Sequence, residues 1–240
     1  MIVGGQDAIA DWHERMRLLG ARVGRPFRKL GRFLELFRVD LPPRALGSKA
    51  TRIGLLRQNS AFIIPVIEEE GGKVWTLIGE EFRAGAGMRL TGFAAGSNDK
   101  DEKLRAMAER ELQEELGIAP SWLMEVRLIP TFRGADFVSP GGTNEQIALY
   151  EARVKLPKGR SVKGLRSRVR GAAGEAESIT SHVRELTPEL FHSLHNNNEK
   201  LGLLLLLLAR ARRGGGAEGG DIAILVDSIL AAAAEGAHAV

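Results

Sequence analysis

The chain contains no cysteine and few aromatic residues, and both shortages narrow what it can do. None of its 240 residues is cysteine, so disulfide bonds, zinc–thiolate sites and thiol nucleophiles are excluded. Aromatic residues make up 5% of the sequence, with a single tyrosine, which argues against a surface that stacks nucleic-acid bases. The lack of cysteine is compatible with a reducing compartment, and we expect a cytoplasmic protein.

The sequence also lacks an apolar run long enough to cross a membrane. The longest run, from Leu203 to Ala209, has seven residues, whereas a membrane span needs about 20. An arginine-rich stretch at residues 15–38 admits an organelle transit peptide as an alternative, but such peptides are poor in acids. Glu35 lies within this stretch and Asp40 just after it, so we expect a folded or docking segment and no membrane partner.

The overall composition is that of an ordinary globular protein with an excess of positive charge. Hydrophobic residues make up 44% and charged residues 27% of the chain. The net charge of +4 and the sequence pI of about 9.6 favour polyanionic ligands in general. Charge alone does not separate a phosphorylated small molecule from RNA.

A helix bounded by glycines lies in the middle of the sequence. Turn and N-cap residues, Gly96 to Asp99, precede it, and Gly117 supplies its end. At about 100° per residue, one stripe of this helix contains, in order, Leu104, Ala108, Glu111 and Glu115. The apolar face therefore becomes a carboxylate face halfway along the helix.

Glu111 and Glu115 stand where a helix selected for stability alone would avoid acids. They repel each other one turn apart, and the macrodipole disfavours anions in this half of the helix by about 0.3–1 kcal/mol each. A divalent cation reverses both effects, because hard oxygen ligands converging from successive turns suit Mg²⁺ or Mn²⁺. The pattern therefore predicts a metal site, with a solvated acidic face as the alternative.

The same stretch resembles the box of the Nudix hydrolases, G-x5-E-x7-R-E-U-x-E-E-x-G-U, where U is a bulky aliphatic residue. All nine fixed positions match over the 23 residues from Gly96 to Ile118. The matching residues are Gly96, Glu102, Arg110, Glu111, Leu112, Glu114, Glu115, Gly117 and Ile118. The resemblance implies a Mg²⁺-dependent enzyme, with Mn²⁺ as the alternative ion, that hydrolyses a nucleoside diphosphate linked to another moiety.

Three further segments resemble the ADP-ribose and ADP-sugar pyrophosphatase branch of this family, including the plant-type ADP-sugar enzymes. Residues 81–83 end in an arginine, where the branch has one near the substrate phosphates. Residues 139–145 read SPGGTNE, close to the branch signature SPGG-x-x-E, and residues 175–179 resemble an acidic loop that supplies a metal ligand and a base. The resemblance implies hydrolysis of ADP-ribose or ADP-glucose to AMP and a sugar phosphate.

The resemblance also assigns roles to individual residues. The substrate-binding residues that it implies are Arg57, Arg83, Ser139, Gly141 and Gly142. The metal ligands that it implies are the Ala95 carbonyl and the carboxylates of Glu111, Glu114, Glu115 and Glu177. The catalytic residues that it implies are Glu115, Glu175 as the base that deprotonates water, and Glu145 as the competing base. Arg110 is expected to orient a box carboxylate rather than to bind substrate.

Two departures from the branch pattern concern substrate recognition. Gly92 stands where the branch has the glutamate of Glu-Leu-Pro-Ala-Gly, which could remove a substrate contact or a dimer contact. Residues 157–173 form a longer and more basic insert than the branch leads us to expect. A UDP-sugar diphosphatase is therefore an alternative. A non-catalytic Nudix-fold protein that binds nucleotide or RNA is an alternative from another class, although such relatives typically lose box glutamates.

Strands and helices are expected on both sides of the box. Residues 1–40 show helical spacing, with a break at Gly24–Pro26, and strands are expected at 61–67, 74–79, 123–131 and 145–154. The predicted class is α+β, a Nudix α/β/α sandwich with a mixed β-sheet and helical N- and C-terminal extensions. We expect an N-terminal extension at 1–56, a Nudix domain at 57–213, and a glycine linker with a C-terminal helix at 214–240, assembled as a homodimer around a small nucleotide sugar.

Overall fold

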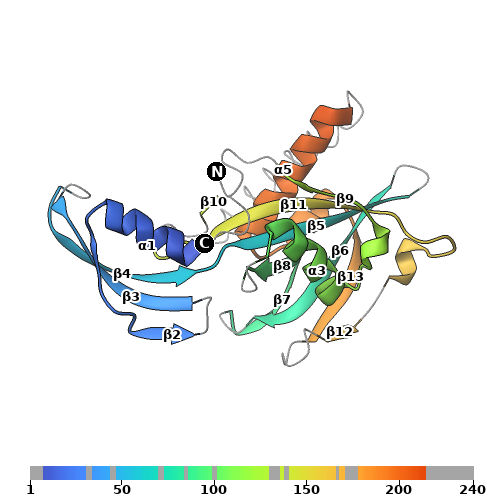
Figure 1. The fold of residues 1–240 in the computed structure, drawn as a ribbon. Coiled ribbons are helices and arrows are strands. Elements are labelled where there is room, and N and C mark those ends of the chain that lie inside the picture. Colours follow the sequence, from blue (N-terminus) through green and yellow to red (C-terminus); the bar gives the residue numbers. More distant parts are fainter. Residues whose placement is uncertain are drawn as a thin grey trace, which may run out of the picture. The chain divides into compact units, whose positions relative to one another are not determined.

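The computed structural model describes ten stretches of the chain (Figure 1). These are residues 8–30, 34–43, 47–69, 73–83, 86–98, 102–129, 136–137, 141–165, 168–170 and 178–214. The chain divides into two compact units. Unit 1 comprises Met1–Ala61, Ala95–Met107 and Thr131–Ala148, and unit 2 comprises Phe62–Ala94, Ala108–Pro130 and Leu149–Val240.

Unit 1 contains an N-terminal helix and a small antiparallel sheet. The helix is α1 (Ala8–Leu18), and the strands are β1 (Arg22–Val23), β2 (Arg28–Leu30), β3 (Leu34–Leu41) and β4 (Ala50–Arg57). Strand β3 pairs with each of the other three. Ile9 of α1 packs with Phe37, Val39 and Leu56 of the sheet, and the ring of Trp12 meets Phe37 edge-on with centroids 4.4 Å apart. These contacts form the core of the unit.

The prediction of helix for residues 27–37 is wrong, because β2 and β3 occupy most of this stretch. In β3 the buried side chains are Glu35, Phe37 and Val39, whereas Leu36 between them is 37% exposed. Glu35 is held inside by Lys29, whose Nζ lies 2.5 Å from its Oε1. A buried acid and an exposed leucine hide the period-2 pattern of a strand, so the remaining apolar residues imitate helical spacing.

Unit 2 is built on a larger sheet. Neighbouring strands follow the order β11 (Gln146–Val154), β5 (Ser60–Glu68), β6 (Val74–Arg83), β13 (Ser178–Glu185) and β12 (Arg168–Arg170). Strand β7 (Met88–Gly92) pairs with β6, β8 (Ala94–Ser97) with β5, and β9 (Leu123–Leu128) with β11. β5, β8 and β11 begin or end in unit 1, where β10 (Asp136–Phe137) pairs with the start of β11. The strands expected at 61–67, 74–79, 123–131 and 145–154 are confirmed, with modest shifts at their ends.

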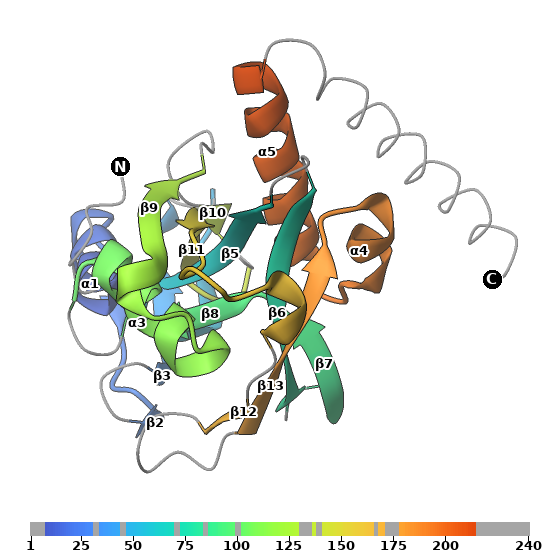
Figure 2. The same ribbon diagram turned by 90° about the vertical axis from the view of Figure 1, so that its right-hand side faces the viewer.

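Helices pack against this sheet and follow its last strand. Helix α3 (Leu104–Leu116) carries the box residues, and short 3₁₀ turns lie at Pro120–Trp122 and Val162–Gly164. Strand β13 leads into α4 (Pro188–Ser193) and then α5 (Asn197–Gly214) (Figure 2). The α+β class is thereby confirmed. The helix expected at 221–234 lies outside the described residues, and none of the helices described has the length and apolar character that a membrane crossing needs.

Candidate functional site

The box helix ends where the sequence predicts but begins later than expected: α3 starts at Leu104, Glu102 lies before its first turn, and Gly96 and Ser97 belong to strand β8. The side chain of Asn98 accepts a hydrogen bond from the backbone N–H of Glu102 at 3.0 Å, just before the first turn of α3. At the other end Gly117 takes φ +68°, and the N–H of Ile118 donates to the carbonyl of Leu112 at 3.0 Å. This left-handed residue followed by a backward hydrogen bond is the usual glycine-based helix end. The C-terminal end of α3 therefore follows the prediction, whereas the bond from Glu102 to Asn98 fixes the turn that precedes the helix.

The carboxylates of α3 share the inward side of the helix with its apolar residues. Ala108, Leu112 and Leu116 are fully buried, and Glu111 beside them is buried as well. Glu114 and Glu115 are half-buried. The stripe inferred from the sequence is thus real, and burying an acid there needs a compensating partner.

Arg110 supplies part of that compensation. Its Nη1 lies 2.7 Å from Oε2 of Glu114 and 2.8 Å from Oε1 of Glu111. The guanidinium is itself half-buried, so charge-assisted hydrogen bonds of this kind hold their geometry better than at an exposed surface. Arg110 therefore bridges two box carboxylates, as the sequence predicts for an orienting residue.

The donor chemistry of the box suits a hard cation. Glu111, Glu114 and Glu115 offer carboxylate oxygens from one helical turn, and such oxygens are what Mg²⁺ and Mn²⁺ prefer. Within the stretches that the structure describes, however, no three acidic or imidazole side chains converge closely enough to hold a metal ion. The box alone would therefore need further ligands, such as carbonyl or water oxygens, to complete a site.

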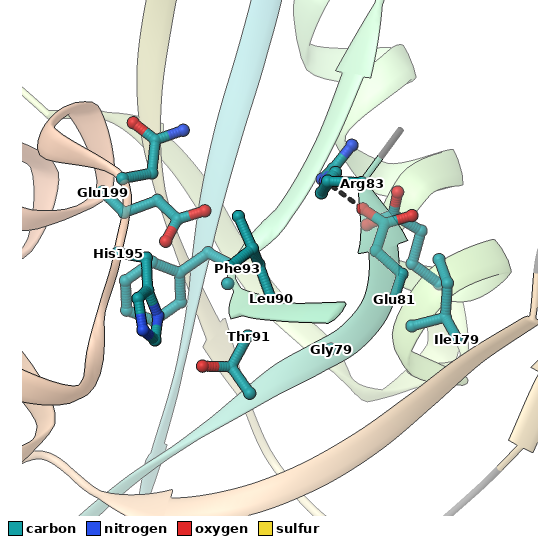
Figure 3. A pocket seen from close by; sticks show the side chains of 12 residues that line it. Gly79, Glu81, Arg83, Leu90, Thr91, Phe93, Ile179, His195 and Glu199 are labelled. Atoms are coloured by element: carbon teal, nitrogen blue, oxygen red, sulfur yellow. Dashed lines mark ion pairs between the residues drawn. The ribbon is translucent and has the colours of Figure 1, made fainter. Parts of the chain in front are cut away.

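A pocket in unit 2 brings Glu115 together with residues of the sheet and of α5 (Figure 3). Arg83, at the end of β6, reaches it and forms an ion pair with Glu81. The arginine side chain is 47% exposed and the glutamate 13%, so the cation faces the opening while its partner lies deeper. The remaining lining residues are Gly79, Leu90, Thr91, Gly92, Phe93, Ile179, His195, Asn196 and Glu199.

Glu199 was not among the predicted site residues, yet it is an acid of the pocket with a strongly raised pKa. Burial raises its pKa to about 8; the carboxylate of Glu81 adds to this shift, and the charge of Arg83 opposes it. One oxygen, Oε2, is buried without a hydrogen-bond partner. The signal in the sequence was Gly92, because the missing side chain at that position leaves room for the carboxyl group of Glu199.

Unit 1 holds the other candidate acid, Glu145, in a fixed position. Its side chain is buried, and Oε1 accepts a hydrogen bond from the Ser60 hydroxyl at 2.5 Å. Oε2 accepts one from Nη1 of Arg57 at 3.1 Å. Both oxygens of Glu145 are therefore already engaged, and Arg57 is engaged with Glu145.

The segment before Glu145 is tied to strand β4 by its backbone and by Asn144. The carbonyl of Gly142 accepts a hydrogen bond from the N–H of Leu55 at 2.9 Å. The Asn144 side chain accepts from the N–H of Arg57 at 2.7 Å and donates to its carbonyl at 3.0 Å. These bonds fix the described end of the SPGG-like segment, whose Gly141 is exposed.

Some of the predicted catalytic, substrate-binding and metal-binding residues remain untested. Ser139, Glu175 and Glu177 lie outside the described residues. Ala95 lies on β8 in unit 1 and is half-buried. The assignment of Glu175 as the base and of Glu177 and the Ala95 carbonyl as metal ligands stays a prediction.

Comparisons with known proteins give a fold but no family. No protein-family profile matches the chain, and no curated protein matches it. Solved structures do match, among them the crystal structure of a protein described as an ADP compounds hydrolase. That structure aligns with a TM-score of 0.57 over 81% of this chain and 96% of its own, with 14% of residues identical. The match supports the α+β fold predicted from the box, and at this identity it shows the fold alone.

Proposed function

We propose that this chain hydrolyses the pyrophosphate bond of an ADP-sugar, ADP-ribose or ADP-glucose, to AMP and a sugar phosphate. The observation that carries the proposal is the geometry of α3, where Arg110 bridges Glu111 and Glu114 while Glu115 faces a pocket that also contains an arginine. The complete box makes a catalytic role more plausible than a binding role alone. The description of the matching structure as an ADP compounds hydrolase agrees with this assignment.

The protein's own cations and acids would divide the work. Mg²⁺ or Mn²⁺, when bound by box carboxylates, would neutralise charge on the diphosphate. Arg83 would neutralise a further phosphate oxygen, for which it must exchange its bond to Glu81 for one to the substrate. Arg110 would keep Glu111 and Glu114 in place without touching the substrate.

Hydrolysis needs a base to take a proton from the attacking water. The water oxygen bonds to one phosphorus while the bridging P–O bond breaks, which leaves two phosphomonoesters. We assign the base to Glu175. Glu145 stays the competing candidate: the bonds that it accepts from Ser60 and Arg57 hold it in place, and each of its oxygens keeps a further lone pair.

A panel of nucleotide sugars tests the proposal. ADP-ribose, ADP-glucose, UDP-glucose and GDP-mannose are incubated with the full chain and Mg²⁺, and the phosphomonoester products are measured after phosphatase treatment. Turnover of ADP-sugars that stops with a chelator supports the proposal. Preference for UDP-glucose would replace it with a UDP-sugar diphosphatase, and no turnover of any compound would reject it.

One observation keeps an RNA-binding alternative open. The guanidinium of Arg160 lies 4.9 Å from the centre of the Trp122 ring, and the exposed Lys155 and Lys158 precede it in the chain. A cation stacked on an aromatic ring beside further cations is also found in nucleic-acid sites. Salt-dependent RNA binding without turnover would favour this alternative.

The domain limits and the homodimer belong to the same proposal. Residues 57–213 would form the catalytic domain, flanked by extensions at 1–56 and 214–240. Light scattering on the full chain and on a chain ending at Arg213 would show whether the protein is a dimer and whether the last segment is needed for it.

A further inference from the structure

The carboxyl group of Glu199 occupies space that a side chain at position 92 would otherwise fill. A β-carbon at position 92 would clash with Oε1 of Glu199 and would lie 2.9 Å from its Cδ and 3.1 Å from its Oε2. Real β-carbons do not approach other atoms this closely, so Glu199 can lie here only because residue 92 is glycine. In the sequence pattern that this segment resembles, position 92 is a glutamate. This chain instead has the carboxyl group of Glu199, from α5 (Asn197–Gly214), beside position 92.

The carboxyl group of Glu199 is buried without full compensation. The residue is 4% exposed, and its Oε2 has no hydrogen-bond partner. Leaving such a group unsatisfied costs free energy that the fold would avoid by placing an apolar residue there. A buried polar group of this kind inside a pocket is better explained by a ligand that completes its hydrogen bonds.

The pocket has two chemically different sides. Figure 3 shows Arg83 and Glu81 together on one side, and Glu199 with His195 on the other. Thr91 and Asn196 also line the pocket, so Glu199 is accompanied by hydroxyl, imidazole and amide groups. The arginine side suits a phosphate, whereas the other groups suit a ligand with many hydroxyls.

We propose that Glu199 is a substrate-binding residue whose carboxyl group hydrogen-bonds the hydroxyl groups of the sugar attached to the diphosphate. This inference rests on the proposed function. A sugar hydroxyl both donates and accepts hydrogen bonds, so it satisfies Oε2 whether the carboxyl group is protonated or ionised. A direct metal ligand is a poorer assignment, because the described acids of the pocket do not converge on a common point.

The test compares two diphosphates that share the ADP moiety and differ in the group attached to the β-phosphate. ADP-ribose carries a sugar on its β-phosphate, and ADP methyl ester carries a methyl group. Binding is measured by calorimetry with a chelator present, and KM and kcat are measured with Mg²⁺. Glu199→Gln is compared with Glu125→Gln, a control whose half-exposed side chain lies outside the pocket.

Glu199→Gln is expected to raise the Kd and KM for ADP-ribose about tenfold, the loss typical of a hydrogen bond to a buried acid. The Kd and KM of Glu199→Gln for ADP methyl ester should stay unchanged. The Kd and KM of Glu125→Gln should stay unchanged for both ligands. Equal losses for both ligands, a fall in kcat alone, or no loss would overturn the inference. Weaker Mn²⁺ binding by Glu199→Gln, measured by electron paramagnetic resonance, would assign Glu199 to the metal instead and also overturn it.

A variant on the other side of the contact keeps the test decisive if Glu199→Gln fails to fold. Gly92→Ala should displace the carboxyl group and weaken ADP-ribose binding to a similar extent, whereas Gly202→Ala on α5 meets side chains only at ordinary contact distances and should not. Unimpaired binding by Gly92→Ala would overturn the inference. If wild-type protein binds ADP-ribose through Glu199 but does not hydrolyse it, the inference stands and the proposed function fails. If wild-type protein does not bind ADP-ribose at all, both fail.

Discussion

Nη1 of Arg110 lies 2.7 Å from Oε2 of Glu114, one turn along the same helix. The same nitrogen also bonds Glu111, so one cation sets the rotamers of two box acids. Ion pairs between residues four apart add only about 0.3–0.5 kcal/mol to an exposed helix. The main effect of the Arg110–Glu114 ion pair is therefore to position the carboxylates rather than to stabilise the helix.

Replacing this arginine should weaken metal use more than folding. With Arg110→Ala we expect the Mg²⁺ concentration for half-maximal turnover to rise about 10- to 100-fold, the usual effect of losing a residue that orients metal ligands. Arg105→Ala, at an exposed position of α3, is the control. The measurement is a Mg²⁺ titration of initial rates. An unchanged titration would show that Arg110 does not orient ligands.

Glu145 should behave as an anchor of unit 1. Glu145→Gln places an amide where Arg57 now donates to a carboxylate, so we expect the free energy of unfolding to fall by about 1–3 kcal/mol. Urea denaturation measures this fall, with Glu125→Gln as control. The rate should still fall at low pH in Glu145→Gln, because another group is the general base whose protonation causes that fall. Loss of that fall with unchanged stability would make Glu145 the base after all.

Gly54 should be irreplaceable for packing. A β-carbon there would lie 2.9 Å from Cζ of Phe37, in the core of unit 1. We expect Gly54→Ala to cost about 1–3 kcal/mol of unfolding free energy, as overpacking of a core does. Gly164→Ala is the control, since its β-carbon would approach only the Ser161 hydroxyl, at 3.7 Å. Equal urea midpoints of unfolding for Gly54→Ala and Gly164→Ala would contradict this account.

The raised pKa of Glu199 should make stability depend on pH in one direction. Its pKa is about 8 in the folded chain against 4.5 ordinarily. Between those values the unfolded chain loses a proton that the folded chain keeps, so the free energy of unfolding falls as pH rises, by at most about 1.4 kcal/mol per pH unit. Urea denaturation from pH 5 to 9, with a chelator present, should show that the free energy of unfolding of the wild type falls with rising pH. Glu199→Gln should not show this fall. Parallel pH curves for the two proteins would contradict this assignment.

Local signals in the sequence predicted the box helix well. The left-handed Gly117 directly follows the last residue of the helix, and the acids repeat at helical spacing beside buried apolar residues, whereas the start of the helix at Leu104 is later than predicted. Such features depend on near neighbours in the chain, so they can be predicted without the fold.

The features that escaped prediction depend on contacts distant in sequence. Glu35 is buried because Lys29 on a neighbouring strand pairs with it, which hid the strand pattern of β3. Glu199 enters the pocket because Gly92, far earlier in the chain, leaves the space. Neither pairing is visible from local periodicity, and only the unusual glycine gave a hint.

The central claim is that the acids of α3 serve a divalent cation in catalysis. Glu115→Gln keeps the shape of a half-buried side chain that lines the pocket and removes its charge. With saturating Mg²⁺, we expect kcat for ADP-ribose to fall at least about 100-fold while the urea midpoint changes little. Turnover of every nucleotide diphosphate at the wild-type rate by Glu115→Gln would contradict the account.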